Sequence, residues 1–312
     1  MMTFTEGKNP IHSHRSALSI TRWKAEASAC GTPLSRYLAS WLAVPEEKAA
    51  DLIDFGSVQV DGRPERRITR VLHGIEEITI HWPWEGIRRH YELDPHRILY
   101  RDTHLLAYDK EAGVPSQQTP SDSYNNLFAA LRRHLEKQGA EAPYAALHHR
   151  LDRETSGIIL FALDRGINRY LGEAFQNRRV TKDYLAWISG NPTEDSWISR
   201  EDIGRRGGRY RAVPQGEGKP AETLFRVLER RGDRSLVLAR PLTGRTHQIR
   251  LHLEARHRPI LGDRLYGGPP DKRLWLHAWR LKLTHPLTGS DLTLCAPIPP
   301  DWPLPHPGKL PD

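Results

Sequence analysis

A nine-residue run rich in charge, at positions 149–157, leads directly into an uninterrupted apolar segment at 158–163. Such a segment is typical of a buried β-strand, which would fix the end of the charged run on a rigid element. The run reads His-Arg-Leu-Asp-Arg-Glu-Thr-Ser-Gly, so Asp152 lies just before the strand. A carboxylate held there can face a cleft, as a catalytic group must. The alternative, and the more common arrangement, is a structural salt bridge of Asp152 with Arg150 or Arg153.

Apolar patterns in the rest of the C-terminal two thirds indicate a sheet combined with helices. Two apolar stretches flank Gly232-Asp233, which favours a hairpin, so the sheet is expected to be at least partly antiparallel. We therefore expect an α+β domain with a central mixed, largely antiparallel sheet. Its expected strands include 105–108, 158–163, 184–188, 223–229 and 235–239, and its expected helices are 127–135, 168–177 and 247–257.

The N-terminal third has a shorter pattern. Leucines recur at helical spacing from Leu34 to Leu42, and a second helical run ends at Gly56. Alternation in the Val-Gln-Val of 58–60 then leads into an Asp-Gly turn, and a further strand follows near residue 80. This order of elements over residues 33–82 resembles the S4 RNA-binding domain, which is a small α/β domain.

The S4-like region departs from its family at the start of the second helix. The family has Ser-Arg there, whereas this sequence has Pro-Glu-Glu-Lys at 45–48, whose carboxylates repel phosphate. Contacts to RNA would then come from basic residues in and after the turn, which position RNA without reading its sequence. These are Arg63, Arg66, Arg67 and Arg70. The alternative is a solvated charged loop.

Composition shifts along the chain predict its division into domains. Residues before the S4-like region show no clear period, and the stretch before the α+β domain contains Pro and Gly without a period. The predicted division is an N-terminal arm at 1–32, the S4-like domain at 33–82, a linker at 83–96, the larger domain at 97–300 and a Pro-rich tail at 301–312.

The charged run at 149–157 resembles the signature loop of the RluA family of RNA pseudouridine synthases. The resemblance implies the pseudouridine synthase fold for the larger domain and assigns the essential carboxylate to Asp152. It also implies that no cofactor is used, because isomerising uridine to pseudouridine neither oxidises anything nor transfers a group. The carboxylate can act as a nucleophile or as a base, and both roles remain open.

Three further segments resemble the same family in the same order. Residues 99–113 are similar to its opening strand and Asn-Lys-Pro-Ala-Gly turn, with Asp109 and Glu111 replacing Asn and Pro. The stretch 180–186 is similar to its Lys-x-Tyr strand, which implies that Tyr184 stacks on the target base and assists proton transfer at C5. Without the resemblance, such a tyrosine is more often a core residue.

The third segment, Gly-Arg-Thr-His-Gln-Ile-Arg at 244–250, resembles the motif whose first arginine pairs with the catalytic aspartate, which implies that role for Arg245. Thr246 is a plausible N-cap for the helix that follows. The alternative is that Arg245 and Arg250 only cap and solvate this helix. Further RNA contacts are expected from basic residues around the cleft, namely Arg150, Arg153, Lys110, Lys182 and Arg250.

The charge balance favours a polyanionic partner. Lys and Arg number 46 against 38 Asp and Glu, a formal net charge of +8, although a basic enzyme without such a partner would show the same balance. With the resemblance, the expected partner is structured ribosomal or transfer RNA, with the target uridine flipped out of its stack. The alternatives are a non-catalytic RNA-binding or ribosome-assembly factor and a hydrolase, although hydrolases of glycosidic bonds generally need two opposed carboxyl groups.

Other site types are disfavoured. The two cysteines, Cys30 and Cys295, lack ligand spacing. His247, His252 and His257 recur every five residues, which turns them away from one helical face, so no metal site is expected. No stretch approaches the roughly 20 apolar residues of a membrane helix, and no signal peptide is evident. We therefore expect a cytoplasmic, monomeric protein that does not associate with membranes.

Overall fold

The computed structural model of the chain describes residues 20–83, 86–303 and 310. Residues 1–19 of the predicted arm and most of the predicted Pro-rich tail lie outside them. No helix in this described part is long and apolar enough to cross a membrane.

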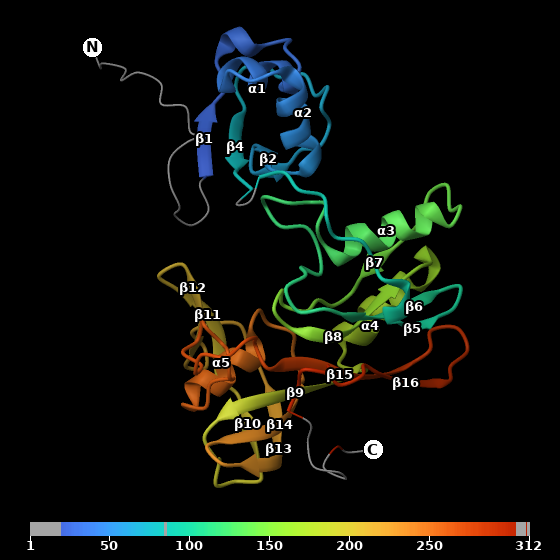
Figure 1. Ribbon diagram of the computed structural model, residues 1–312, viewed down its shortest axis with the longest axis vertical. Coiled ribbons are helices and arrows are strands. Elements are labelled where there is room, and N and C mark those ends of the chain that lie inside the picture. Colours follow the sequence, from blue (N-terminus) through green and yellow to red (C-terminus); the bar gives the residue numbers. More distant parts are fainter. Residues whose placement is uncertain (1–19, 84–85, 304–309, 311–312) are drawn as a thin grey trace. The chain divides into compact units, whose positions relative to one another are not determined.

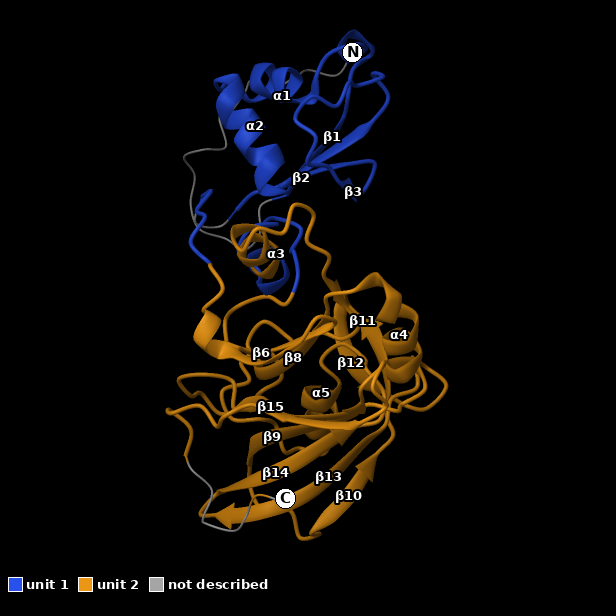
Figure 2. Ribbon diagram, turned by 90° about the vertical axis from the view of Figure 1, so that its right-hand side faces the viewer, with its two compact units in different colours: residues 1–91, 117–130 blue, residues 92–116, 131–312 orange. Residues whose placement is uncertain are grey.

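The chain divides into two compact units (Figure 2). The first contains the chain up to Tyr91 together with residues 117–130, and the second contains residues 92–116 and 131–312. The predicted domains were continuous in sequence, so the inclusion of 117–130 in the first unit is a feature that sequence patterns did not indicate.

The first unit combines two helices with a four-stranded antiparallel sheet of order β1-β4-β2-β3. Leucines at 34, 38 and 42 and Ile53 are buried on the inner faces of the helices, against Ile78 and Ile80 of the sheet. The predicted pair of helices and the strands after them are confirmed. The bounds are β1 Ile20–Lys24, α1 Leu34–Leu42, α2 Glu46–Phe55, β2 Val58–Val60, β3 Arg63–Pro64 and β4 Glu77–His81, with a 3-10 turn at Ala27–Ala29.

Two segments join this unit through partners that are remote in sequence. Strand β1 lies within the predicted arm and forms because it pairs along its whole length with β4. In the 117–130 segment, the amide of Ser123 donates to the carbonyl of Phe55 at 2.8 Å. Asn125 donates to the carbonyl of Arg88 at 2.6 Å. Neither pairing leaves a periodic trace in the sequence.

The second unit is built on a ten-stranded sheet (Figure 1). Its main path is β10-β13-β14-β9-β15-β8-β6-β5, with β16 paired to β15 and β7 to β8. All neighbours are antiparallel except β15 and β8, so the predicted mixed, largely antiparallel sheet is confirmed, as is the β13–β14 hairpin. The strands are β5 Ile98–Arg101, β6 Leu105–Lys110, β7 Ala146–Leu147, β8 Ser156–Ala162, β9 Thr181–Ser189, β10 Ser196–Ser199, β13 Thr223–Arg231, β14 Arg234–Pro241, β15 Leu276–Thr284 and β16 Asp291–Cys295.

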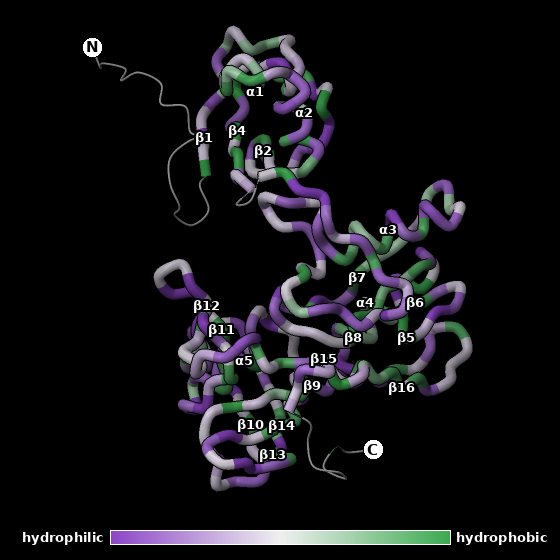
Figure 3. Tube along the Cα trace, viewed as in Figure 1, coloured by the Kyte–Doolittle hydropathy of each residue, from purple (hydrophilic) through white to green (hydrophobic). Residues whose placement is uncertain are grey.

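Helices and one separate hairpin complete the chain. Helix α5 (Gln248–Ala255) packs on β13 and β14 and also on the hairpin of β11 (Asp202–Arg206) and β12 (Arg209–Val213). Figure 3 shows this hairpin as largely hydrophilic towards its tip. The remaining helices are α3 Leu127–Lys137, α4 Asn168–Gln176 and the 3-10 turns Pro95–Arg97 and Arg165–Ile167.

Every residue of β6 and β8 is buried, which places both strands in the interior of the second unit. The loop before β8 carries Asp152, and the start of β8 pairs in parallel with β15. Gly157 makes this pairing possible, because a Cβ atom there would lie 2.1 Å from the carbonyl oxygen of Ala278. Its φ of +110° is also open to glycine and strained for other residues.

Candidate active site

The loop that carries Asp152 is fixed on both sides of that residue. On one side, the hydroxyl of Ser116 donates to the carbonyl of Leu151 and accepts from its amide, at 2.7 and 3.1 Å. On the other side, the carbonyl of Arg153 accepts from the amide of Gly113 at 2.8 Å. The Asp152 side chain between these anchors remains 20% exposed, so a held carboxylate faces accessible space.

Arg250 is the arginine that meets this carboxylate. Its Nη1 lies 3.4 Å from Oδ2 of Asp152, and its Nε and Nη2 donate to the two carboxylate oxygens of Asp263, each at 2.7 Å. Burial disfavours the charge of Arg250, but the hydrogen bonds and charge of Asp263, together with Asp152, outweigh it and raise the pKa of the guanidinium. A fixed positive charge therefore lies beside Asp152.

The pairing expected for Arg245 is wrong. Arg245 is exposed and its Nε donates to the carbonyl of Pro220 at 2.9 Å. It precedes helix α5, whereas Arg250 lies within the helix, where the helical rotation turns its side chain into the interior. The motif was recognised correctly, but the arginine at its end, which we expected to contact RNA, holds the carboxylate.

Tyr184 lies on β9, close to the same carboxylate. In the sheet, Ala278 of β15 is paired with Gly157 of β8 on one side and with Tyr184 of β9 on the other. Only β15 therefore separates the strand of Tyr184 from β8, at whose start the Asp152 loop ends. Burial raises the pKa of Tyr184, and the negative charge of Asp152 raises it further. The phenol is therefore neutral and lies within electrostatic reach of Asp152.

His247 and Tyr266 complete the surroundings of Asp152. Nε2 of His247 lies 3.9 Å from Oδ1 of Asp152, and its Nδ1 lies 2.6 Å from the hydroxyl of Tyr266. The Tyr266 ring also lies under the guanidinium of Arg250, at 5.0 Å. Sequence reasoning did not assign roles to His247, Tyr266 or Asp263. His247 lies within the motif at 244–250, and the Gly-Asp and Tyr-Gly pairs at 262–263 and 266–267 follow shortly after it, which was the available signal.

The expected N-cap at Thr246 is wrong by one residue. The helix begins at Gln248, and its N-cap is His247, whose φ of 57° and ψ of 22° are left-handed. A left-handed residue other than glycine costs on the order of 1 kcal/mol, and histidine is among the residues found there more often than most. Gln248 stabilises the turn because its Oε1 accepts from the amide of Arg245 and the hydroxyl of Thr243.

The two lysines expected to contact RNA occupy different environments. Lys110 is wrong as an RNA contact, because its side chain is fully buried and its Nζ donates to the carbonyls of Glu111, Val114 and Arg153. It therefore holds the Asp152 loop from within. Lys182 is half-buried on β9, and burial lowers its pKa.

The two arginines beside Asp152 in sequence are exposed. Nη2 of Arg150 donates to the hydroxyl of Thr246 at 3.0 Å, which links the loop to the motif at 244–250. Nε of Arg153 donates to the carbonyl of Gly113 at 2.9 Å. Both side chains leave part of their cationic surface open to a ligand.

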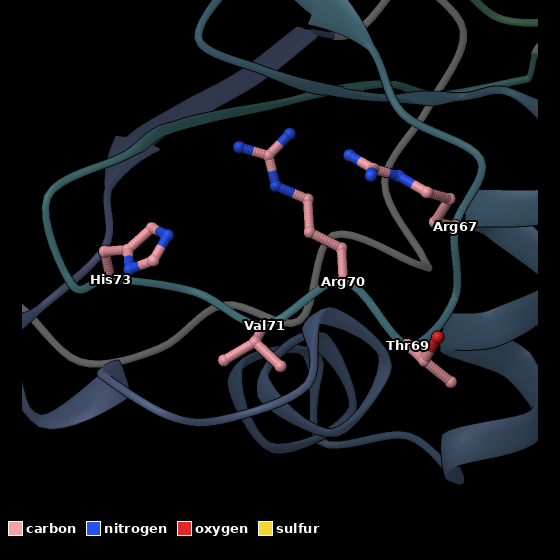
Figure 4. Close-up of a pocket in the computed structure, with 5 residues that line it drawn as sticks. All are labelled: Arg67, Thr69, Arg70, Val71 and His73. Carbon is pink, nitrogen blue, oxygen red and sulfur yellow. The ribbon is translucent and has the colours of Figure 1, made fainter.

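The arginines expected to bind RNA in the first unit are exposed or engaged with carboxylates. Arg67 and Arg70 each donate to Glu65 at 2.9 Å, and Nη2 of Arg66 donates to Asp54 at 3.2 Å. Figure 4 shows Arg67, Thr69, Arg70, Val71 and His73 around one hollow of this unit. Arg63 on β3 is exposed.

Comparison with known proteins identifies what this chain is similar to. Residues 104–255 match the family described as RNA pseudouridylate synthase. The chain is 36% identical to the ribosomal large subunit pseudouridine synthase D of Nitrosomonas europaea, over 67% of this chain and 64% of that protein. It is 33% identical to the ribosomal large subunit pseudouridine synthase C of Escherichia coli, over 87% and 91%. It is also 33% identical to the dual-specificity RNA pseudouridine synthase RluA of that organism, over 64% and 92%.

Solved structures agree with these relatives. Human RNA pseudouridylate synthase domain containing 4 superposes with a TM-score of 0.56 and 25% identity, over 66% of this chain and 89% of that one. Human RNA pseudouridylate synthase domain containing 1 superposes with a TM-score of 0.55 and 30% identity, over 67% and 87%. The fold expected from the resemblance is confirmed.

Proposed function

The chain belongs to the RluA-type family of RNA pseudouridine synthases and isomerises uridine to pseudouridine in RNA, and we propose that Asp152 is the carboxylate that carries the reaction. The observation that supports this role most directly is the contact of Asp152 with Arg250 at 3.4 Å, in a loop held on both sides. The guanidinium favours the ionised form of a neighbouring carboxylate, which is the form that can act as nucleophile or base.

The reaction sets the tasks of the surrounding residues. The bond between N1 and C1′ breaks, the uracil turns, C1′ bonds to C5, the proton on C5 leaves, and N1 takes up a proton, so the product is an isomer of uridine. Under this proposal Tyr184 stacks on the uracil, and its neutral phenol adds no charge against Asp152. Base stacking on an aromatic ring is worth on the order of 1 to 3 kcal/mol, which helps to hold a flipped nucleotide in the site.

We further propose that the substrate is ribosomal RNA. Two of the relatives are named for the large ribosomal subunit, while the Escherichia coli RluA is named as dual-specific. The exposed arginines Arg150 and Arg153 flank Asp152 and offer guanidinium groups to backbone phosphates. The half-buried Lys182 lies on β9, two residues before Tyr184. Transfer RNA is the alternative substrate. Mapping pseudouridine in total RNA from cells that lack the gene distinguishes the two, since the lost sites name the RNA.

The first unit is proposed to bind RNA as an S4-like domain, with the protein acting as a cytoplasmic monomer. Its exposed Arg63 and the guanidinium groups of Arg67 and Arg70 at the hollow support the RNA contact (Figure 4). The test is a charge reversal, Arg63→Glu, which should weaken RNA affinity without slowing single-turnover chemistry at saturating RNA. Light scattering of the free protein tests the monomer.

The role of Asp152 is tested with Asp152→Asn, which preserves shape and removes the charge. Tritium release from C5-labelled uridine in RNA should be abolished, while RNA binding measured by filter retention should stay nearly intact. Retained tritium release would exclude Asp152 as the reacting carboxylate. Release of free uracil from the RNA would instead indicate a hydrolase.

A further inference from the structure

The second carboxylate oxygen of Asp152 faces a histidine that the reaction scheme above does not use. Arg250 approaches Oδ2 at 3.4 Å, and Nε2 of His247 lies 3.9 Å from Oδ1. That gap exceeds a hydrogen bond, but hydrogen bonds in active sites are often long without substrate and tighten when it binds. The carboxylate thus lies between a permanent cation and an imidazole.

Tyr266 determines how this imidazole carries its proton. Its hydroxyl lies 2.6 Å from Nδ1 of His247. Burial raises the pKa of Tyr266, so the phenol keeps its proton and can donate it to Nδ1. Burial likewise lowers the pKa of His247, against the opposing charge of Asp152, so the ring is neutral near pH 7. A neutral imidazole that accepts at Nδ1 must carry its hydrogen on Nε2.

The N–H of His247 therefore faces the carboxylate, and the reverse tautomer would set a lone pair against a negative charge. The other charged groups around the ring are Arg250, Asp263 and Arg150, and the ring edge of Tyr210 lies against it at 6.0 Å between centroids. These groups lie on the loop before β8, helix α5, the 263–266 turn and the β11–β12 hairpin. The hydroxyl of Tyr266 and the ring of Tyr210 contact the imidazole from two of these elements.

We propose that His247 is a positioning residue that holds Oδ1 of Asp152 through its Nε2–H while Arg250 holds Oδ2, and that Tyr266 fixes the required tautomer. The proposal rests on the proposed role of Asp152. The backbone of His247 also supports it. His247 is the N-cap of α5, but its side chain makes no capping hydrogen bond to the helix. The left-handed conformation instead accompanies an imidazole that reaches towards the carboxylate.

A pair of substitutions separates the donor from the backbone requirement. Asparagine adopts left-handed backbone more readily than glutamine, but only the longer glutamine carries an amide N–H to the position of Nε2. We expect His247→Asn to lower the single-turnover rate at saturating RNA by about tenfold to a hundredfold, because the reacting group loses its fixed geometry. We expect His247→Gln to retain most of the wild-type single-turnover rate. RNA affinity should be the same for the two variants.

The opposite order, with Asn more active than Gln, would overturn the proposal and leave His247 a purely structural turn residue. A change in RNA affinity without a change in the single-turnover rate would overturn it as well. Thermal melting of both variants, read beside activity, shows whether a lost rate comes from lost folding.

The role of Tyr266 is tested with a double-mutant cycle. Tyr266→Phe keeps the ring under Arg250 but removes the hydroxyl that faces Nδ1, so it should slow the chemistry in the wild-type background. In the His247→Gln background, where no tautomer exists to be fixed, the same change should have little effect. Equal effects in both backgrounds would contradict the proposed link. Activity of Asp152→Asn would instead overturn the proposed function itself, so the two failures are distinguishable.

Discussion

Arg250 and Asp152 are 98 residues apart in sequence, and their side chains meet at 3.4 Å in the second unit. The same guanidinium holds Asp263 in a bidentate ion pair. Arg250, on helix α5, therefore links the loop of Asp152 to the turn at Asp263 through ion pairs. Predictions about the site depend on this arrangement.

The first prediction compares the two arginines of the 244–250 motif. Arg250→Lys keeps a positive charge but cannot bridge Asp263 and Asp152 with a planar fork, so the single-turnover rate of tritium release should fall on the order of a hundredfold. Arg245→Lys changes an exposed side chain that donates to the carbonyl of Pro220. The single-turnover rate of this variant should lie within about threefold of the wild-type rate at saturating RNA. Equal losses would mean that the pairing seen here is not the working one.

The second prediction concerns the ring of Tyr184. Tyr184→Leu removes the aromatic face and should lower catalytic efficiency by about tenfold to a hundredfold, in line with the free energy of base stacking. Tyr184→Phe keeps the face and isolates the contribution of the hydroxyl. The measurement is tritium release with each variant across a range of RNA concentrations. A leucine variant as active as the phenylalanine variant would exclude stacking as the role.

The third prediction concerns the close approach of β8 and β15. Gly157→Ala would place a methyl group 2.1 Å from the carbonyl oxygen of Ala278, at a left-handed φ of +110°. It should lower the free energy of unfolding by about 3 kcal/mol or prevent folding. The matched control is Gly232→Ala, also at positive φ but with nothing within 4 Å, where the expected cost is only about 1 kcal/mol. Chemical denaturation followed by circular dichroism measures both.

The fourth prediction is the acid sensitivity of the first unit through Glu65. Hydrogen bonding from Arg67 lowers the pKa of Glu65 from 4.5 to about 2, with burial opposing and Arg70 assisting. Because the folded state binds the proton less tightly than the unfolded state, this stabilisation is full above pH 4.5 and is lost as the pH falls towards 2. Discounted for the exposure of Arg67, its size is about 2 kcal/mol.

The variant Glu65→Gln should therefore be less stable than wild type at pH 6, and the difference should shrink as the pH is lowered from 4.5 towards 2. Chemical denaturation at each pH measures the free energy of unfolding for both proteins. A difference that is constant with pH would show that the charge of Glu65 contributes nothing and that only its shape matters.

Local patterns predicted the elements well, because the forces behind them act over a few residues. The apolar run at 158–163, the hairpin signal at Gly232-Asp233 and the leucine spacing of α1 each describe one segment and its burial. The motifs likewise identified the family, since a nine-residue loop with its charge pattern can be read without knowing its neighbours in space. Strand β1 was missed because a five-residue strand depends on its partner β4 rather than on its own pattern.

The sequence by itself determined the family, the principal strands and helices, and the loop on which Asp152 lies. Only the tertiary structure decided that Arg250 rather than Arg245 meets Asp152, that Lys110 is buried as an anchor of the loop, and that Ser123 belongs to the first unit. The physical reason is common to all three. Each depends on how helices and loops from distant parts of the chain pack together, and a contact between remote residues is set by that packing and not by the spacing of residues within either segment.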